Sequence, residues 1–272
     1  MTRILLALLS VVAVCGPCAI ADDAPASRPA LYVNHSGLSK LGWQLACVSS
    51  TFQSRSNGEM IDLLHSLNFH HIELSAGQFD PSDLNAADAL AAKLKSVHMD
   101  IVSIGIIDPG TTEKEARKFF EFGKQLKIKT IVVDPADDSL ETLDKLANEY
   151  RINVAIENFA KPGHHWDPTA SMSLVAGRSS RVGFCADVAA WRGSGVSPVD
   201  AVKLLSGHIL VVRPGSFDVG DAVDVLGELK DQKFKGICAL GCAPQPESDL
   251  MDRFTRTINA FSTIVGSLNG SK

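Results

Sequence analysis

The sequence predicts an α/β protein that forms a single (β/α)8 barrel. Eight short apolar runs recur along the 272 residues, and each is followed by an amphipathic helical stretch. Strands this apolar belong to a parallel sheet that helices cover, and eight such units in one domain favour a closed barrel over a doubly wound open sheet. No Gly-x-Gly-x-x-Gly follows the first strand, which weakens the dinucleotide-binding alternative.

The N-terminus is typical of a secretory signal peptide over residues 1–21. Arg3 precedes an apolar run over 4–14, and an Ala-x-Ala cleavage pattern occupies 19–21. The run is shorter than the ~20 residues that cross a bilayer. We therefore expect an exported protein, periplasmic or secreted, that is not attached to a membrane after cleavage.

The domain boundaries follow from this pattern. After the signal peptide we expect an irregular lead-in over 22–40, the barrel over 41–266 and a tail over 267–272. Removing 21 of the 272 residues leaves 251, which fits the roughly 250 residues typical of such barrels. The formal net charge of −5 becomes −6 without Arg3, and no basic block stands out. Nucleic acid is therefore not an expected partner.

Four cysteines follow the predicted cleavage site: Cys47, Cys185, Cys238 and Cys242. Export permits disulfides, but four cysteines are too few for a disulfide scaffold. Cys238-x-x-x-Cys242 lacks a second ligand pair at zinc-site spacing, so buried thiols or one disulfide are favoured. Because the first and eighth strands of a closed barrel are neighbours, Cys47 and Cys242 are the pair that could be bridged, if their Cα atoms lie within about 7 Å.

The expected elements alternate along the whole chain. The strands are expected at 42–48, 71–74, 101–106, 130–133, 153–156, 182–186, 208–212 and 236–240. Helical spacing of apolar residues marks the stretches between them, and Pro168 and Pro198 suit the first turns of two helices. Asp167 and Ser197 are then the expected N-caps of those helices.

In such barrels the chemistry lies at the carboxyl ends of the strands. The polar residues at these ends are Glu73, Asp108, Asp134, Glu157, Asn158, Asp187 and Arg213. Asp108 and Asp134 are read as helix N-caps. Glu157 ends an apolar run, where an unpaired carboxylate would be costly. We therefore expect a cation, a sugar hydroxyl or a basic partner such as Arg213 or Lys161 to face it.

Several stretches resemble the xylose isomerase-like TIM-barrel family, also called the sugar phosphate isomerase/epimerase family. They are HHIELSAG, NVAIENF and VGFCADVAAW, with GHILVVRPG and GICALGC at the strands expected next. The resemblance covers roughly residues 41–266, and it implies isomerase or epimerase chemistry on a carbohydrate-like ligand. In the epimerase branch a divalent metal is held by a glutamate ending strand five, an aspartate ending strand six, a histidine on strand seven and a glutamate ending strand eight.

By this resemblance, Glu157 is a metal ligand and catalytic residue, and Asp187 is the second metal ligand. The histidine and the second glutamate fall at about Val212 and Gly241, so two of the four ligands are missing. The implied cofactor is a weakly bound Mn²⁺ or Mg²⁺ ion. Because proton transfer needs a paired base and acid, the resemblance implies a degenerate site with weak or no isomerase activity.

At or near the strand ends, Glu73, Asn158, Trp191 and Arg213 are the expected substrate-binding residues. Glu157 and Asp187 should lie close together, so the pKa of one carboxyl should be raised unless Arg213 or a cation lies between the two. If the register is right, substituting Val212→His and Gly241→Glu should strengthen metal binding.

Four functions stay open at this point. The favoured one is an exported isomerase/epimerase-like barrel with a degenerate metal site, and an active enzyme with a reorganised site using His164 and His165 is an alternative. A non-catalytic barrel that binds a carbohydrate or a partner, with Trp166 and Trp191 as stacking surfaces, is another. A hydrolase or lyase using only carboxylates has no matching motif in the sequence.

Overall fold

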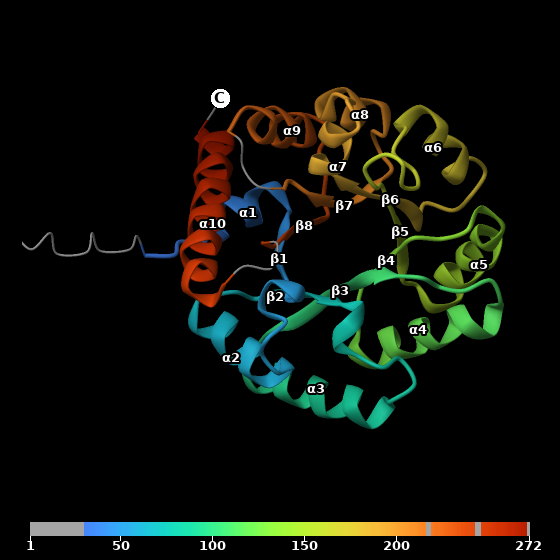
Figure 1. The fold of residues 1–272 in the computed structure, drawn as a ribbon, viewed down its shortest axis with the longest axis horizontal. Coiled ribbons are helices and arrows are strands. Elements are labelled where there is room, and N and C mark those ends of the chain that lie inside the picture. The colour runs from blue at the N-terminus through green and yellow to red at the C-terminus, as the bar shows by residue number, and fades with distance from the viewer. Residues whose placement is uncertain (1–29, 216–218, 243–245, 271–272) are drawn as a thin grey trace, which may run out of the picture.

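The computed structural model describes residues 30–215, 219–242 and 246–270 and contains a closed barrel of eight parallel strands in the order β1 to β8 (Figure 1). The strands are β1 (Gln44–Val48), β2 (His71–Ser75), β3 (Asp100–Ile107), β4 (Thr130–Val133), β5 (Asn153–Glu157), β6 (Val182–Asp187), β7 (Ile209–Arg213) and β8 (Ile237–Leu240). Each expected strand is found with its ends shifted by two residues or fewer. The predicted (β/α)8 barrel is confirmed.

Helices surround the strands on all sides (Figure 1). They are α1 (His35–Leu41), α2 (Asn57–Ser66), α3 (Leu84–Ser96), α4 (Glu113–Leu126), α5 (Leu140–Tyr150), α6 (Pro168–Val175), α7 (Val188–Gly193), α8 (Pro198–Leu204), α9 (Val219–Asp231) and α10 (Glu247–Gly270). Asp167 and Ser197 accept hydrogen bonds from backbone N–H groups at the starts of α6 and α8, as expected. The connection from β6 to β7 holds two helices, α7 and α8, where the sequence predicted a turn and one helix.

Two apolar cores hold the barrel together. One fills its interior and consists of Ala46, Val102, Val132, Ala155, Cys185, Val211, Ile237 and Ala239; the larger one packs the strands against the helices. Because successive side chains of a strand point to opposite faces, the residue two positions further along each strand also faces inward. Glu157, Asp187 and Arg213 follow Ala155, Cys185 and Val211 in this way, at the carboxyl ends of their strands.

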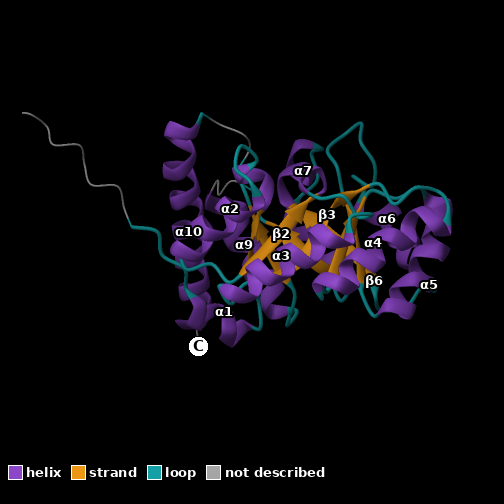
Figure 2. Ribbon diagram, turned by 90° about the horizontal axis from the view of Figure 1, so that it is seen from below, coloured by secondary structure: helices purple, strands orange, loops and turns teal. Residues whose placement is uncertain are grey.

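The lead-in and the tail differ from expectation. Helix α1 lies within the segment 22–40 that was predicted to be irregular, and Asn34 caps it by accepting a hydrogen bond from Gly37 N–H. Helix α10 continues past the expected barrel end at residue 266, and Asn269 Nδ2 donates to Gly37 O at 3.2 Å. Figure 2 shows α1 and the C-terminal end of α10 at the same end of the barrel. Packing between these two helices therefore orders both segments.

The predicted signal peptide, residues 1–21, lies outside the described residues. Within the described ranges, no helix has the length and apolar character needed to cross a membrane.

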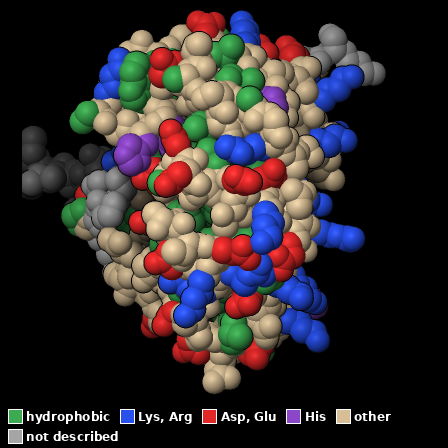
Figure 3. Space-filling view, turned by 90° about the vertical axis from the view of Figure 1, so that its right-hand side faces the viewer, with side chains coloured by type: hydrophobic (Ala, Val, Ile, Leu, Met, Phe, Trp, Pro, Cys, Tyr) green, Lys and Arg blue, Asp and Glu red, His purple; other side chains and the backbone are tan. Residues whose placement is uncertain are grey.

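The face over α4 and α5 carries side chains of both charge signs (Figure 3). Arg117 there pairs with Glu113 at 2.5 Å and also with Glu149, and Lys145 pairs with Glu113 at 2.8 Å.

The four cysteines are free thiols. Cys47, Cys185 and Cys238 are buried, and Cys242 is partly buried. Of the two possibilities left open by the sequence, the structure therefore contains buried thiols, and the Cys47–Cys242 disulfide is absent.

Candidate active site at the barrel mouth

Arg213 bridges two buried carboxylates at the carboxyl ends of the strands. Its Nε lies 3.0 Å from Glu157 Oε1 and donates a hydrogen bond to Glu157 Oε2 at 3.1 Å. Its Nη2 lies 2.6 Å from Glu73 Oε1. The three residues come from β7, β5 and β2, so the closed barrel brings together positions that are far apart in the sequence. We call this group the Glu73–Arg213–Glu157 triad.

The triad is largely buried, and its two carboxylates also accept hydrogen bonds from other barrel residues. The side chains of Glu73, Glu157 and Arg213 are 0%, 2% and 14% exposed. Ser103 Oγ donates to Glu73 Oε2 at 2.8 Å, and the thiol of Cys185 hydrogen-bonds to Glu157. Glu73 Oε1 has the guanidinium of Arg213 as its partner, at 2.6 Å. Buried charges need such partners, because an unpaired charge in an apolar interior is strongly destabilising.

The pKa of the Glu157 carboxyl is set more by burial than by the neighbouring cation, Arg213. Loss of hydration raises the pKa of its carboxyl to about 7, although the charge of Arg213 and the hydrogen bond from Cys185 act in the opposite direction. The negative charges of Asp187 and Glu73 add to the rise. The sequence predicted a raised pKa for one carboxyl unless Arg213 lay between the pair. Arg213 does contact Glu157, yet the pKa is raised because desolvation is the largest effect.

Arg213 remains a cation in spite of its burial. Burial by itself would lower the pKa of the guanidinium, but the charges of Glu73 and Glu157 raise it well above its ordinary value. The mouth therefore contains a permanent positive charge in contact with two carboxylates.

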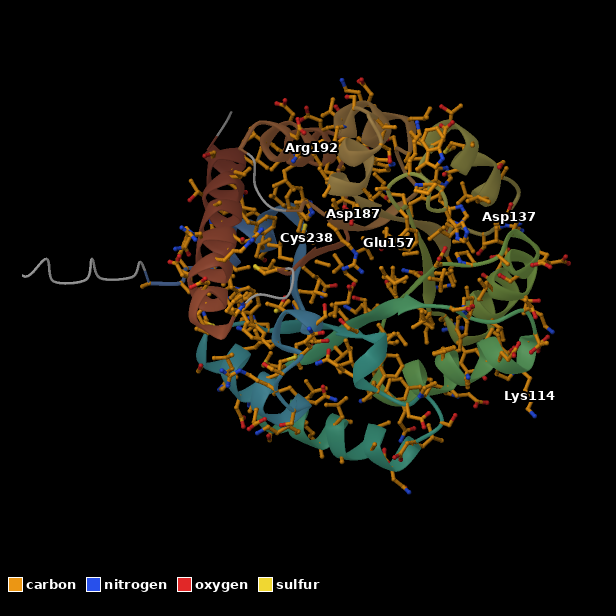
Figure 4. The ribbon with its side chains drawn as sticks, viewed as in Figure 1. Lys114, Asp137, Glu157, Asp187, Arg192 and Cys238 are labelled. Carbon is orange, nitrogen blue, oxygen red and sulfur yellow. The ribbon has the colours of Figure 1, made fainter. Side chains whose placement is uncertain are left out.

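Asp187 lies beside Glu157 on the neighbouring strand (Figure 4). Its Oδ1 accepts a hydrogen bond from Ala190 N–H at 3.0 Å, so the carboxylate is the N-cap of α7. Asn158 fixes its backbone, as the amide Nδ2 donates to Asp187 O and Oδ1 accepts from Asp187 N–H. Among the described residues, Asp187 forms no ion pair. The hydrogen bond from Ala190 N–H gives the carboxylate a structural role at the start of α7.

Two residues that the sequence assigned to the site have other roles. Trp191 was predicted to bind substrate and to act as a stacking surface, but its side chain is 1% exposed and packs in the core between strands and helices. Val212, where the missing histidine was expected, packs in the helix-facing core, whereas its neighbour Arg213 contacts the carboxylates.

The position proposed for the second glutamate is crowded. A Cβ atom at Gly241 would lie 2.9 Å from Thr51 Oγ1 and 3.0 Å from Val48 Cβ. Thr51 Oγ1 is already engaged there, since it accepts a hydrogen bond from Cys242 N–H at 3.0 Å. A glutamate at 241 would therefore require the end of β1 to move.

The loop after β5 does not supply replacement ligands to the triad. His164 Nδ1 lies 2.9 Å from Asp134 Oδ1, and this hydrogen bond raises the pKa of the imidazole. Asp134 was expected to cap a helix and is instead the partner of this histidine. Lys161, an expected partner of Glu157, has its Nζ 3.7 Å from the centroid of the Trp166 ring.

Asp108 also differs from expectation. Its Oδ1 accepts a hydrogen bond from Gly110 N–H within the turn after β3, whereas Thr112 caps α4.

Ser103 and Cys185, which support the triad, were not recognised from the sequence. The alternation of side chains could have indicated Cys185, which precedes Asp187 by two residues and shares its face. No sequence signal singled out Ser103.

The residues at the mouth do not fit the Mn²⁺ or Mg²⁺ ion that the resemblance implies. Such ions take about six oxygen donors, whereas Glu73 and Glu157 already face the guanidinium of Arg213. The described part of the chain contains no group of three His, Cys, Asp or Glu side chains arranged to hold a metal. A cation placed between these carboxylates would also be repelled by Arg213.

No protein-family model and no curated protein matches the chain, but solved structures do. A protein of unassigned function from Parabacteroides distasonis is 22% identical, with a TM-score of 0.68 over 83% of this chain and 99% of that one. A D-psicose 3-epimerase solved with D-fructose is 16% identical, with a TM-score of 0.67 over 84% and 100%. A xylose isomerase domain-containing protein from Salmonella typhimurium is 15% identical, with a TM-score of 0.62 over 80% and 97%. At these sequence identities the similarity is evidence for the fold alone. The chain has the fold of the xylose isomerase-like TIM barrels, so the resemblance is confirmed for the fold.

Proposed function

We propose that the protein binds a carbohydrate-like ligand at the carboxyl ends of its strands and has little or no metal-dependent isomerase or epimerase activity. The observation that carries this proposal is the Glu73–Arg213–Glu157 triad, in which a guanidinium contacts the carboxylates where metal-dependent chemistry would need an ion. The location supports a ligand site, because barrels of this kind bind their ligands at this end. A solved structure with this fold is a D-psicose 3-epimerase.

The chemistry of the mouth suits a neutral, hydroxyl-rich ligand. Sugar hydroxyls donate to carboxylates such as Asp187 and accept from the N–H groups of a guanidinium such as Arg213. The permanent positive charge of Arg213 is surrounded by three acidic groups: Glu73, Asp187 and a Glu157 carboxyl whose pKa is about 7. This balance disfavours a strongly anionic ligand.

Metal-dependent isomerisation needs more than the mouth contains. Moving a proton from one carbon to another, or inverting one carbon, requires a base and an acid in contact with the substrate. Glu157 can serve as one of them, but the position of the second glutamate is Gly241. Loss of one partner lowers the rate by roughly 10²–10⁴-fold.

The test measures sugar binding, metal binding and turnover separately. D-Fructose, D-tagatose and D-psicose are titrated into the protein and followed by calorimetry and thermal shift. Each sugar is also incubated with the protein, with and without Mn²⁺, and the products are separated by chromatography. We expect binding of at least one sugar, weakened in Asp187→Ala and kept in the control His164→Ala, and no turnover. Failure of all three sugars to bind would contradict the ligand assignment, and stoichiometric Mn²⁺ with turnover abolished by Glu157→Ala would contradict the rest.

One observation favours a second function, an active isomerase or epimerase with a reorganised site. A carboxyl with a pKa of about 7 is well matched to proton transfer near neutral pH. This function predicts sugar turnover that chelators leave unchanged and that Glu157→Gln abolishes. Absence of turnover in the same assay excludes it for the sugars tried.

We also propose that residues 1–21 direct the chain out of the cytoplasm. Arg3, the apolar run 4–14 and the Ala-x-Ala pattern support this. The full 272-residue chain is produced in a Gram-negative host, and the periplasmic fraction is analysed by mass spectrometry. We expect a mature protein that begins at Asp22, and an uncleaved chain retained in the cytoplasm would contradict the proposal.

A further inference from the structure

We infer that Arg213 is a built-in cation that occupies the place of a divalent metal ion, so that its removal would convert the barrel mouth into a metal site. This inference concerns the same site as the proposed function, but it does not depend on the identity of the ligand. Its test measures only metal binding by Arg213 variants, whereas the proposed ligand site is tested by sugar binding. A failure of one proposal therefore does not imply a failure of the other.

The geometry of the guanidinium supports this assignment. Arg213 contacts Glu157 through Nε at 3.0 Å and Glu73 through Nη2 at 2.6 Å, so one planar group faces carboxylates from two strands, β5 and β2, that are not neighbours in the barrel. Arg213 follows the interior residue Val211 by two positions, and it therefore points into the mouth as a ligand on β7 would. The side chain is 14% exposed, which places the positive charge within the barrel rather than in solvent.

The surrounding charges require a cation. Glu73 is fully buried, Glu157 is 2% exposed, and the charge of Asp187 acts on Glu157 from the next strand. Three acidic groups around one small volume are unstable without compensation. Hard divalent ions bind carboxylate oxygens, and arginine satisfies the same oxygens with N–H donors and a permanent charge. A divalent ion and the Arg213 guanidinium therefore exclude each other, because both would use the same carboxylate lone pairs and the same space.

Cys185 and Ser103 limit how far the carboxylates can move when the arginine is absent. The Cys185 thiol hydrogen-bonds to Glu157, and Ser103 Oγ donates to Glu73 Oε2 at 2.8 Å. Both partners lie on strands of the barrel, so the carboxylates should stay directed into the mouth. Removal of the guanidinium would therefore leave oxygen donors grouped around an empty position.

Two substitutions test the inference. Arg213→His removes the permanent charge and places an imidazole on β7, and Arg213→Met removes the charge without adding a ligand. Mn²⁺ binding is measured by calorimetry and by the loss of the free-ion electron paramagnetic resonance signal, above the pKa of histidine. We expect Mn²⁺ to bind Arg213→His about tenfold or more tightly than the unmodified protein, and Arg213→Met to an intermediate degree. Mn²⁺ should also raise the melting temperature of both variants but not of the unmodified protein.

Three controls isolate the effect. Arg213→Lys retains a cation and should bind no more Mn²⁺ than the unmodified protein. Arg256→Met removes an exposed arginine, which pairs with Asp252 on α10, and should change nothing. Adding Glu157→Gln to Arg213→His should abolish the gained binding, because a carboxylate ligand is lost.

Several results would overturn the inference. Equal Mn²⁺ affinity in Arg213→His, Arg213→Met and the unmodified protein would show that the arginine does not occupy a metal position. Retention of the gained binding after Glu157→Gln would place the ion elsewhere. If neither Arg213→His nor Arg213→Met folds in millimolar Mn²⁺, the ion does not replace the charge, and the inference is wrong.

Discussion

Asn158 and Asp187 hold each other at the ends of neighbouring strands. The Asn158 amide Nδ2 donates to Asp187 O at 3.0 Å, and its Oδ1 accepts from Asp187 N–H at 2.7 Å. One side chain thus satisfies both backbone groups of the residue that caps α7. The substrate-binding role expected for Asn158 stays a prediction, and the structure adds a positioning role, because these two hydrogen bonds fix the backbone from which the Asp187 carboxylate extends.

Replacing Asn158 should therefore destabilise the fold. Asn158 is 5% exposed, and Asn158→Ala removes its hydrogen bonds to the partly buried N–H and C=O groups of Asp187. We expect a loss of about 1–3 kcal/mol in the free energy of unfolding, measured by urea denaturation. The matched control is Asn148→Ala, because Asn148 donates to Asp144 O on the exposed side of α5. A loss in the control as large as that in Asn158→Ala would refute the positioning role.

The raised pKa of Glu157 should be visible in the pH dependence of stability. The folded-state pKa is about 7 and the ordinary value is 4.5, so between these values the folded state binds more protons than the unfolded state. The contribution of Glu157 is therefore fully present below about pH 4.5 and is lost as the pH rises through about 7. Relative to Glu157→Gln, the unmodified protein should gain stability as the pH falls across this window. Parallel pH profiles of the two proteins would contradict the raised pKa.

The histidines at the opposite end of the barrel should have the opposite effect. Burial is the main cause that lowers the pKa of His70 and His71 below the ordinary value of 6.5, and the neighbouring imidazole of His35, stacked on His70 at 4.3 Å, adds to it. A lowered pKa contributes stability that is present above about pH 6.5 and is lost as the pH falls.

The charged groups around this cluster act in both directions. The charge of Asp100 raises the pKa of His71, Lys129 lowers it, and His65 lowers the pKa of His70. We expect His71→Gln to reduce the loss of stability on acidification, measured by thermal unfolding between neutral pH and the acid range. His98→Gln is the control. If His71→Gln leaves the acid-side slope unchanged, the cluster does not govern it.

Two glycines should respond oppositely to substitution by alanine. A Cβ atom at Gly183 would lie 2.2 Å from the backbone oxygen of His208, so β6 and β7 could not approach each other as they do. Gly183→Ala should cost about 1–3 kcal/mol in the free energy of unfolding by overpacking. A Cβ atom at Gly227, inside α9, would meet no neighbouring atom within 4 Å, so Gly227→Ala should add about 0.5–1 kcal/mol. Urea denaturation of both variants checks the pair, and equal signs would contradict the packing argument.

Much of the candidate site could be predicted from strand ends alone. Glu73, Glu157, Asp187 and Arg213 were all recognised, because each follows a short apolar run and the ends of parallel strands meet at one side of a barrel. A basic partner for Glu157 was expected, with Arg213 and Lys161 as candidates. The sequence could not choose between them, since the choice depends on whether a side chain faces the barrel interior.

The sequence by itself determined the eight-fold alternation of strands and helices, because apolar periodicity is a local property that survives in one dimension. It also determined which polar side chains reach the strand ends. Only the tertiary structure decided that Arg213, and not Val212, points into the mouth, because a shift of one residue in a strand reverses the face of every side chain. It likewise decided that Trp191 is buried and that a guanidinium joins Glu73 to Glu157, since these contacts depend on closing the barrel and bringing β2, β5 and β7 around one small volume.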